Sequence, residues 1–171
     1  MIPLSFVTSR GLTWSKAHEK DKYELTFHGE VAASLHRVNR WSATFLAESC
    51  AGRWAFRRTG FLGSDTEIVD LDSSQRIATF KANWSGGGTL AFCDGETFRF
   101  ACRGVWRPVW NVLDDNGETV LHLDTRERTV DLVKEPAVNE GRLALLIIFA
   151  WHRMLQAAED AAEVAVMAAA S

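Results

Sequence analysis

Apolar and polar residues alternate over many short segments of this chain, and one continuous apolar block follows them. Strict alternation is the pattern of half-buried β-strands. The block, LALLIIFAW at residues 143–151, would be apolar on every side of a helix. A helix of that kind has to be buried all round. The order of these elements predicts a sheet that wraps around one C-terminal helix.

The first predicted hairpin covers residues 23–35, where apolar residues alternate on both sides of His28-Gly29-Glu30. A three-residue loop at 28–30 makes the two apolar faces coincide, and side-chain parity fixes the register of a half-buried strand pair. Glycine is also favoured in loops of this length. The expected pairs are Phe27 with Val31, Leu25 with Ala33, and Tyr23 with Leu35.

Two further hairpins follow from the same reasoning. A loop at 94–96 would pair Phe92 with Phe98 and Leu90 with Phe100, with Cys93 facing away from these rings and Cys102 sharing their face. Asn116-Gly117 is a strong hairpin signal. It would pair Val112 with Leu121 and Trp110 with Leu123, and bring Leu113 and Val120 together on the other face.

The other predicted strands are shorter or less regular. They cover residues 42–49, 52–58, 66–71, 76–84 and 129–133. Many short strands at regular spacing are typical of a sandwich or barrel. Asn139 would cap the helix and Glu140 would favour its first turn. We expect a mainly β fold: an antiparallel β-barrel of about ten to twelve strands around the helix, with residues 1–155 forming the barrel unit and 156–171 an Ala-rich helical extension.

Composition fits one ordered domain. The chain has 171 residues, of which 47% are hydrophobic, with seven Trp and ten Phe that are expected mainly in a wide core. Net charge is −3, and the small basic excess at 52–107 is too weak for nucleic-acid binding.

The N-terminal segment lacks the pattern of a signal peptide, and the apolar block is shorter than the roughly 20 residues of a membrane span. Three cysteines without CxxC spacing fit reduced thiols in a cytoplasmic protein.

Catalytic and metal-binding signatures are not recognisable in the sequence, so we expect no catalytic residue, no metal site and no cofactor. The five histidines lack HxH or HxxxH spacing, and there is no GxSxG motif. The aspartates near residues 70 and 114 fit turns better than a calcium loop. His152 follows the apolar block, and we interpret it as a hydrogen-bonded histidine at the mouth of the core.

Basic residues in the middle of the chain are the candidate ligand-binding residues. They alternate with aromatic residues, which would place the two kinds on opposite faces of the barrel wall. The exterior would then carry an Arg-rich stripe able to contact anionic lipid head groups or phosphorylated ligands. An ordinary solvated surface explains the same pattern about as well. The residues concerned are Arg53, Arg57, Arg58, Lys81, Arg99, Arg103 and Arg107.

The order of the predicted elements over residues 6–155 resembles that of the tubby C-terminal-like superfamily. The features that carry the resemblance include the hairpin at 106–124 and the helix at 142–155. The superfamily includes the tubby, LURP-one-related and phospholipid scramblase proteins. The resemblance implies a β-barrel with a central helix and a membrane-linked role: phosphoinositide binding in tubby proteins, a calcium-linked lipid role in scramblases. No Lys/Arg pair matches the tubby lipid site, and residues 128–139 lack the acidic scramblase segment. The resemblance therefore carries over the fold and no site residue.

These observations predict a non-enzymatic binding module in the cytoplasm, peripheral at a membrane. Its expected partner is an anionic phospholipid head group or another protein, and not nucleic acid. One alternative is a lipocalin-type carrier of a small apolar ligand, although the terminal helix would occupy its cavity. The other alternative is an enzyme, which would require a cluster of perturbed titratable groups in a cleft.

Overall fold

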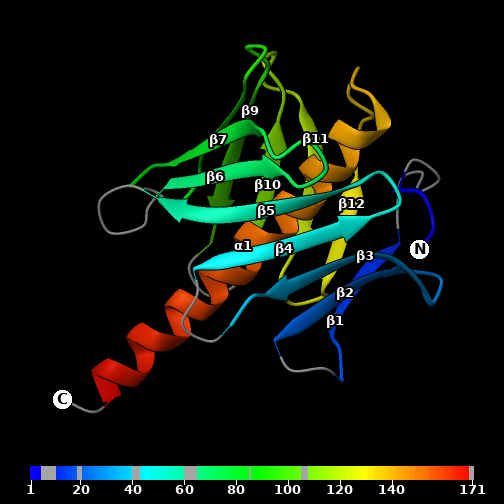
Figure 1. The fold of residues 1–171 in the computed structure, drawn as a ribbon. Helices are drawn as coiled ribbons and strands as arrows, with labels where there is room; N and C mark the ends of the chain where they lie inside the picture. Colours follow the sequence, from blue (N-terminus) through cyan, green and yellow to red (C-terminus); the bar gives the residue numbers. More distant parts are fainter. Residues whose placement is uncertain are drawn as a thin grey trace.

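A computed structural model describes residues 1–4, 11–18, 21–39, 43–59, 65–84, 86–104 and 108–169. Twelve β-strands form one closed antiparallel barrel around a single helix (Figure 1). The elements are β1 (Leu12–Lys16), β2 (Lys22–Phe27), β3 (Glu30–Arg37), β4 (Thr44–Ser49), β5 (Gly52–Thr59), β6 (Asp65–Asp70), β7 (Arg76–Ala82), β8 (Gly88–Phe92), β9 (Thr97–Arg103), β10 (Val109–Leu113), β11 (Thr119–Asp124), β12 (Thr129–Leu132) and α1 (Glu140–Ala169).

Strand order follows chain order, and β1 closes the ring by pairing with both β2 and β12. The expected fold class is confirmed. We did not predict β1, although Leu12 faces the core and Thr13 faces outward, as in the other strands. Closure removes both free strand edges, which would otherwise be available for pairing with another chain.

The helix α1 runs through the barrel, and its C-terminal part projects beyond the strands (Figure 1). Asn139 caps it: the Oδ1 atom accepts a hydrogen bond from the Arg142 amide at 2.9 Å. Every residue from Leu143 to Gln156 is buried. The helix continues without interruption past residue 155, and Asp160 of this continuation forms an ion pair with Arg58 of β5.

We call the end of the barrel where α1 begins the entry end, and the end where it leaves the exit end. Successive connections between strands lie alternately at these two ends, because the sheet is an antiparallel meander. The turns after β2, β4, β6, β8 and β10 lie at the entry end. The C-terminal ends of β1, β3, β5, β7, β9 and β11 lie at the exit end.

The core consists of inward-facing strand residues packed on α1. Phe149 lies at its centre, with ring centroids 5.2 Å from Phe56, 5.3 Å from Phe80 and 5.7 Å from Phe100, all edge-on. Edge-to-face packing at these distances is the favoured arrangement of aromatic rings. The wide interior is thus filled by aromatic rings, as the composition predicts.

The first hairpin differs from its predicted register near the turn. The pairs Tyr23–Leu35 and Leu25–Ala33 are confirmed, but Phe27 pairs with Glu30 instead of Val31. His28 and Gly29 form a two-residue turn, both with positive φ, as the favoured hairpin turns require. A bulge beside Leu25 and Thr26 absorbs the extra residue, so that Ala32 and Ala33 are both buried.

The second hairpin is shifted by two residues. Leu90 pairs with Phe98, and Gly88 pairs with Phe100, because the turn is Cys93-Asp94-Gly95 with Gly95 at positive φ. The apolar faces still coincide, since the shift is even. A side chain at Gly88 would clash with the Phe80 ring, which packs 5.3 Å from Phe100. Cys93 is exposed and Cys102 packs against the core, as expected, and both thiols are free.

The third hairpin confirms two predicted pairs, Val112–Leu121 and Trp110–Leu123. The predicted meeting of Leu113 and Val120 is wrong. A bulge beside Val112 pairs Leu113 with Thr119 and turns Val120 into the core, where it is fully buried. Bulges cannot be recognised from alternation alone, because they break it.

Candidate functional site

The predicted basic residues occupy three separate places. Arg53 lies at the entry end, where its guanidinium donates to the Asp72 carboxylate at 2.5 Å. Arg99 lies on the outer face of β9, and its guanidinium reaches towards Gly117 in the turn after β10. Arg57, Lys81 and Arg103 are exposed on the outer wall near the exit end. Arg107 lies outside the described residues.

Arg58 faces inward, contrary to the predicted exterior stripe. It alternates with Arg57 along β5 and so shares the face of the buried residues Trp54 and Phe56. Its guanidinium Nη2 lies 3.3 Å from the Asp160 carboxylate of α1. Neighbouring residues in a strand point to opposite faces, so Arg57 and Arg58 cannot belong to one stripe.

The three basic residues of the outer wall, Arg57, Lys81 and Arg103, form what we call the outer basic group. They lie on alternate strands β5, β7 and β9, which are about 10 Å apart. The register also offsets Lys81 from Arg57 by two residues and Arg103 from Lys81 by four along the strands. Among the described residues, none of the three has a carboxylate partner. Their charges are therefore available to a ligand.

Trp84 is fully exposed at the tip of the hairpin between β7 and β8, where an amide hydrogen bond from Gly86 to the Asn83 carbonyl closes a tight turn. Our sequence prediction placed Trp84 in a strand, but β7 ends at Ala82. The glycine run at residues 86–88, which begins two residues after Trp84, indicates a turn. Exposed tryptophan beside basic residues is typical of protein surfaces that contact membranes or partners.

Charge separates between the two ends of the barrel. Among the described residues, the entry end is mainly acidic, with Glu30, Glu48, Asp70, Asp72, Asp94, Glu96, Asp114, Asp115, Glu118, Glu135 and Glu140 against Arg53, Arg76, Arg99, Lys134 and Arg142. In the described part of the chain, the exit end has a small basic excess, with Lys16, Lys22, Arg37, Arg57, Arg58, Lys81, Arg103, Arg126, Arg128 and Arg153 against Asp21, Glu24, Asp65, Glu67, Asp124, Glu127, Glu159 and Asp160. Acidic groups around the start of α1 also suit the positive end of its dipole.

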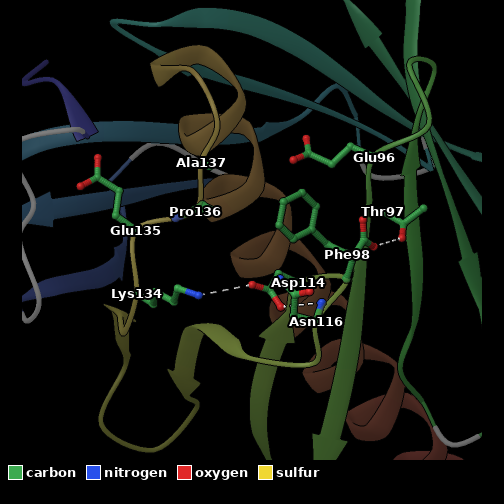
Figure 2. A pocket seen from close by; sticks show the side chains of 10 residues that line it. Glu96, Thr97, Phe98, Asp114, Asn116, Lys134, Glu135, Pro136 and Ala137 are labelled. Carbon is green, nitrogen blue, oxygen red and sulfur yellow. Dashed lines mark hydrogen bonds and ion pairs between the residues drawn. The ribbon is translucent and has the colours of Figure 1, made fainter.

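A pocket of about 270 Å³ opens at the entry end (Figure 2). Its wall is acidic, and three of its carboxylates have partners: Lys134 contacts Asp114 at 3.7 Å, the Thr97 hydroxyl donates to Asp115, and Arg142 pairs with Glu96. On the other side of the start of α1, Arg142 donates to Asp94 at 2.6 Å. This end is therefore an ion-paired surface that would repel an anionic ligand.

The exit end holds a polar cluster inside the mouth of the barrel. Tyr23 donates its hydroxyl to Glu159 at 3.1 Å, and Arg37 pairs with the same carboxylate. Burial and the Glu159 carboxylate raise the pKa of the Tyr23 hydroxyl. Deeper inside, Arg153 donates to the Gln156 side chain at 2.8 Å and lies 4.7 Å over the Phe80 ring.

His152 is buried beside this cluster, among the rings of Phe45 and Phe56 at 4.8 Å and 5.0 Å. Among the described residues, neither ring nitrogen has a hydrogen-bond partner, so our expectation of a hydrogen-bonded histidine is wrong. Burial, followed by the charges of Arg153, Arg58 and Arg37, lowers the pKa of His152 well below its usual value of 6.5.

This shift predicts that the protein loses stability in mild acid. The unfolded chain binds a proton at His152 below pH 6.5 whereas the folded protein does not, so stability falls as the pH falls. The free energy of unfolding, measured with urea, should be about 1.4 kcal/mol lower near pH 5.5 than near pH 7.5. In His152→Phe the difference should disappear, and an unchanged difference in that variant would contradict the assignment.

No protein-family model, no curated protein and no solved structure matches this chain. The class of the protein is therefore defined by its fold: a closed antiparallel β-barrel around a C-terminal helix. No helix in the described part of the chain is long and apolar enough to cross a membrane.

Proposed function

We propose that this protein is a non-enzymatic binding module that attaches to membranes by binding anionic phospholipid head groups at the exit end of the barrel. Membership of the tubby C-terminal-like superfamily and a peripheral cytoplasmic location belong to the same proposal. The observation that carries it is the gathering, at one end, of the outer basic group and the fully exposed Trp84.

Physical chemistry supports an anionic surface as the ligand. Each basic side chain near such a surface contributes about 1 kcal/mol, without needing a shaped pocket. The wide spacing of Arg57, Lys81 and Arg103 suits many head groups of one membrane better than one small molecule. Trp84 adds an amphipathic ring that is favoured at the boundary between head groups and acyl chains.

The interior of the barrel favours this function over a lipocalin-type carrier. Side chains of α1 from Leu143 to Leu155 belong to the same core as the inward-facing strand residues. The space that a carrier would keep for its ligand is thus occupied by the protein's own helix.

Co-sedimentation with liposomes tests the proposal. The wild-type protein should bind vesicles containing anionic lipid and not neutral vesicles, and binding should weaken as salt rises. The triple variant Arg57→Glu, Lys81→Glu, Arg103→Glu should bind on the order of 100-fold more weakly, since three favourable contributions are removed. Trp84→Ala should cause a smaller loss.

The chain offers a matched control at the entry end. Arg53→Glu, Arg76→Glu, Lys134→Glu changes the net charge by the same amount on the opposite end, and it should retain most of the binding. Equal loss in the two triple variants would show that only net charge matters. No binding by the wild-type protein would refute the lipid proposal and direct attention to protein partners.

A further inference from the structure

Several buried polar atoms inside the barrel have no hydrogen-bond partner among the described residues. Near the exit end they include Thr66 Oγ1 of β6 and, on α1, Arg153 Nε and both ring nitrogens of His152; the indole nitrogens of Trp14, Trp110 and Trp151 lack a partner as well. A buried polar group without a partner costs free energy, so native proteins rarely retain one unless another molecule satisfies it. Several in one place indicate a binding site.

The β-sheet register brings these groups together. Thr66 pairs with Arg58 on one side and with Phe80 on the other, so all three face inward in one row across β5, β6 and β7. Arg153 of α1 lies over the Phe80 ring at 4.7 Å, next to the Thr66 position. Arg58, Thr66 and Arg153 therefore surround one point on the inner rim of the mouth.

Guanidinium groups gather at this point. Those of Arg37 and Arg58 contact the carboxylates of Glu159 and Asp160 of α1. Within the described chain Arg153 contacts no carboxylate, although its residue is only 8% exposed, and its hydrogen-bonded partner is the neutral Gln156. A buried cation without a counter-ion is costly, and an anion bound beside it would remove that cost.

We propose that Arg58, Thr66 and Arg153 form a binding site for a small oxyanion of the phosphate or sulfate class. The guanidinium N–H groups and the hydroxyl are all hydrogen-bond donors, which match the acceptor oxygens of such an anion. The site lies inside the mouth and is distinct from the outer basic group. It does not depend on the proposed membrane attachment, and either proposal can fail while the other holds.

Asp160 acts as an internal competitor at this site. Its carboxylate lies 3.3 Å from Arg58, whereas charge-assisted hydrogen bonds are usually about 2.7–2.9 Å long. Its side chain is also 55% exposed. An incoming oxyanion would displace this weakly held carboxylate from Arg58 and reach Thr66 and Arg153 behind it. Removing the carboxylate should therefore strengthen anion binding.

Calorimetric titration with inorganic phosphate, with chloride at matched ionic strength as the reference, tests the site. The wild-type protein should bind phosphate saturably. Asp160→Asn should bind about tenfold more tightly, and Thr66→Val and Arg153→Met each about tenfold or more weakly, because a hydrogen bond to a charged group is lost. Arg53→Met, at the exposed Arg53–Asp72 pair of the entry end, is the matched control and should bind like the wild type.

Circular dichroism would establish that each variant is folded. Thr66→Val preserves the shape of the side chain, so it keeps the test decisive if Arg153→Met does not fold. The proposal would be overturned by the absence of saturable phosphate binding, or by equal binding in the wild type, Thr66→Val and Asp160→Asn. If chloride at matched ionic strength produced the same heat signal as phosphate, the signal would reflect screening by salt, and the proposed site would be refuted.

Two vesicle arms distinguish the source of the oxyanion. One contains phosphatidylserine, which lacks a terminal phosphate group, and the other contains a phosphoinositide, which has one. If the site takes a lipid head group, Thr66→Val should weaken binding to phosphoinositide vesicles alone. If it takes free phosphate, the variant should lose phosphate binding in solution and bind both kinds of vesicle like the wild type.

Discussion

Replacing Ile147 by aspartate should leave the chain unfolded. Ile147 lies in the middle of the buried part of α1 and is completely shielded from solvent. An unpaired charge at such a position costs several kcal/mol, and a natural domain has only about 5–15 kcal/mol of stability to lose. The variant should lack a cooperative thermal transition by circular dichroism and show collapsed amide dispersion by NMR.

Ala161→Asp is the matched control for this experiment. Residue 161 lies on the same helix but is exposed beyond the mouth of the barrel. The same substitution there should change the stability by less than about 0.5 kcal/mol. A folded Ile147→Asp protein with a normal thermal transition would mean that the helix is not the centre of the barrel.

Phe149→Ala should cost about 3–5 kcal/mol, the usual price of deleting a buried aromatic ring. Phe149 packs edge-on against Phe56, Phe80 and Phe100, which come from three different strands. Its removal leaves a cavity that the closed barrel cannot collapse to fill, because the strands are hydrogen-bonded all round. Urea unfolding would show the loss as a lower midpoint with a similar slope.

Val166→Ala provides the comparison for the ring deletion, since Val166 lies on the projecting part of α1 and is 70% exposed. It should unfold at nearly the wild-type urea concentration. A loss below about 1 kcal/mol in Phe149→Ala would contradict the described packing, because even modest truncations of a rigid core usually exceed that value.

The fold could be predicted because neither the alternation of apolar residues nor the apolar helix depends on the exact register or turn type of the strands. Alternation identifies inward-facing residues such as Leu25 and Leu90 whatever the turn, and a helix apolar on all sides requires a surrounding wall. The exact pairing could not be predicted at the bulges. Ala32 and Ala33 are both buried, and so are Val120 and Leu121, which breaks the period of two on which register prediction depends.

The candidate site was harder to predict, for two reasons. The inward position of Arg58 is not one of them, because the alternation of side chains along β5 already places Arg58 inside and Arg57 outside. The end of the barrel at which a residue lies depends on its position within its strand, and Arg53 and Arg57 lie at opposite ends of β5. The unpartnered state of His152 and Thr66 depends on neighbours from other strands, which no local pattern reveals.

The position of α1 at the end of the element order also determines when the protein can fold during synthesis. All twelve strands leave the ribosome before the helix that fills their interior, and β1 must wait for β12 to close the ring. Domains generally fold as units, and pairings between distant segments form slowly. The inward faces of the strands therefore remain without their core until the apolar segment has emerged.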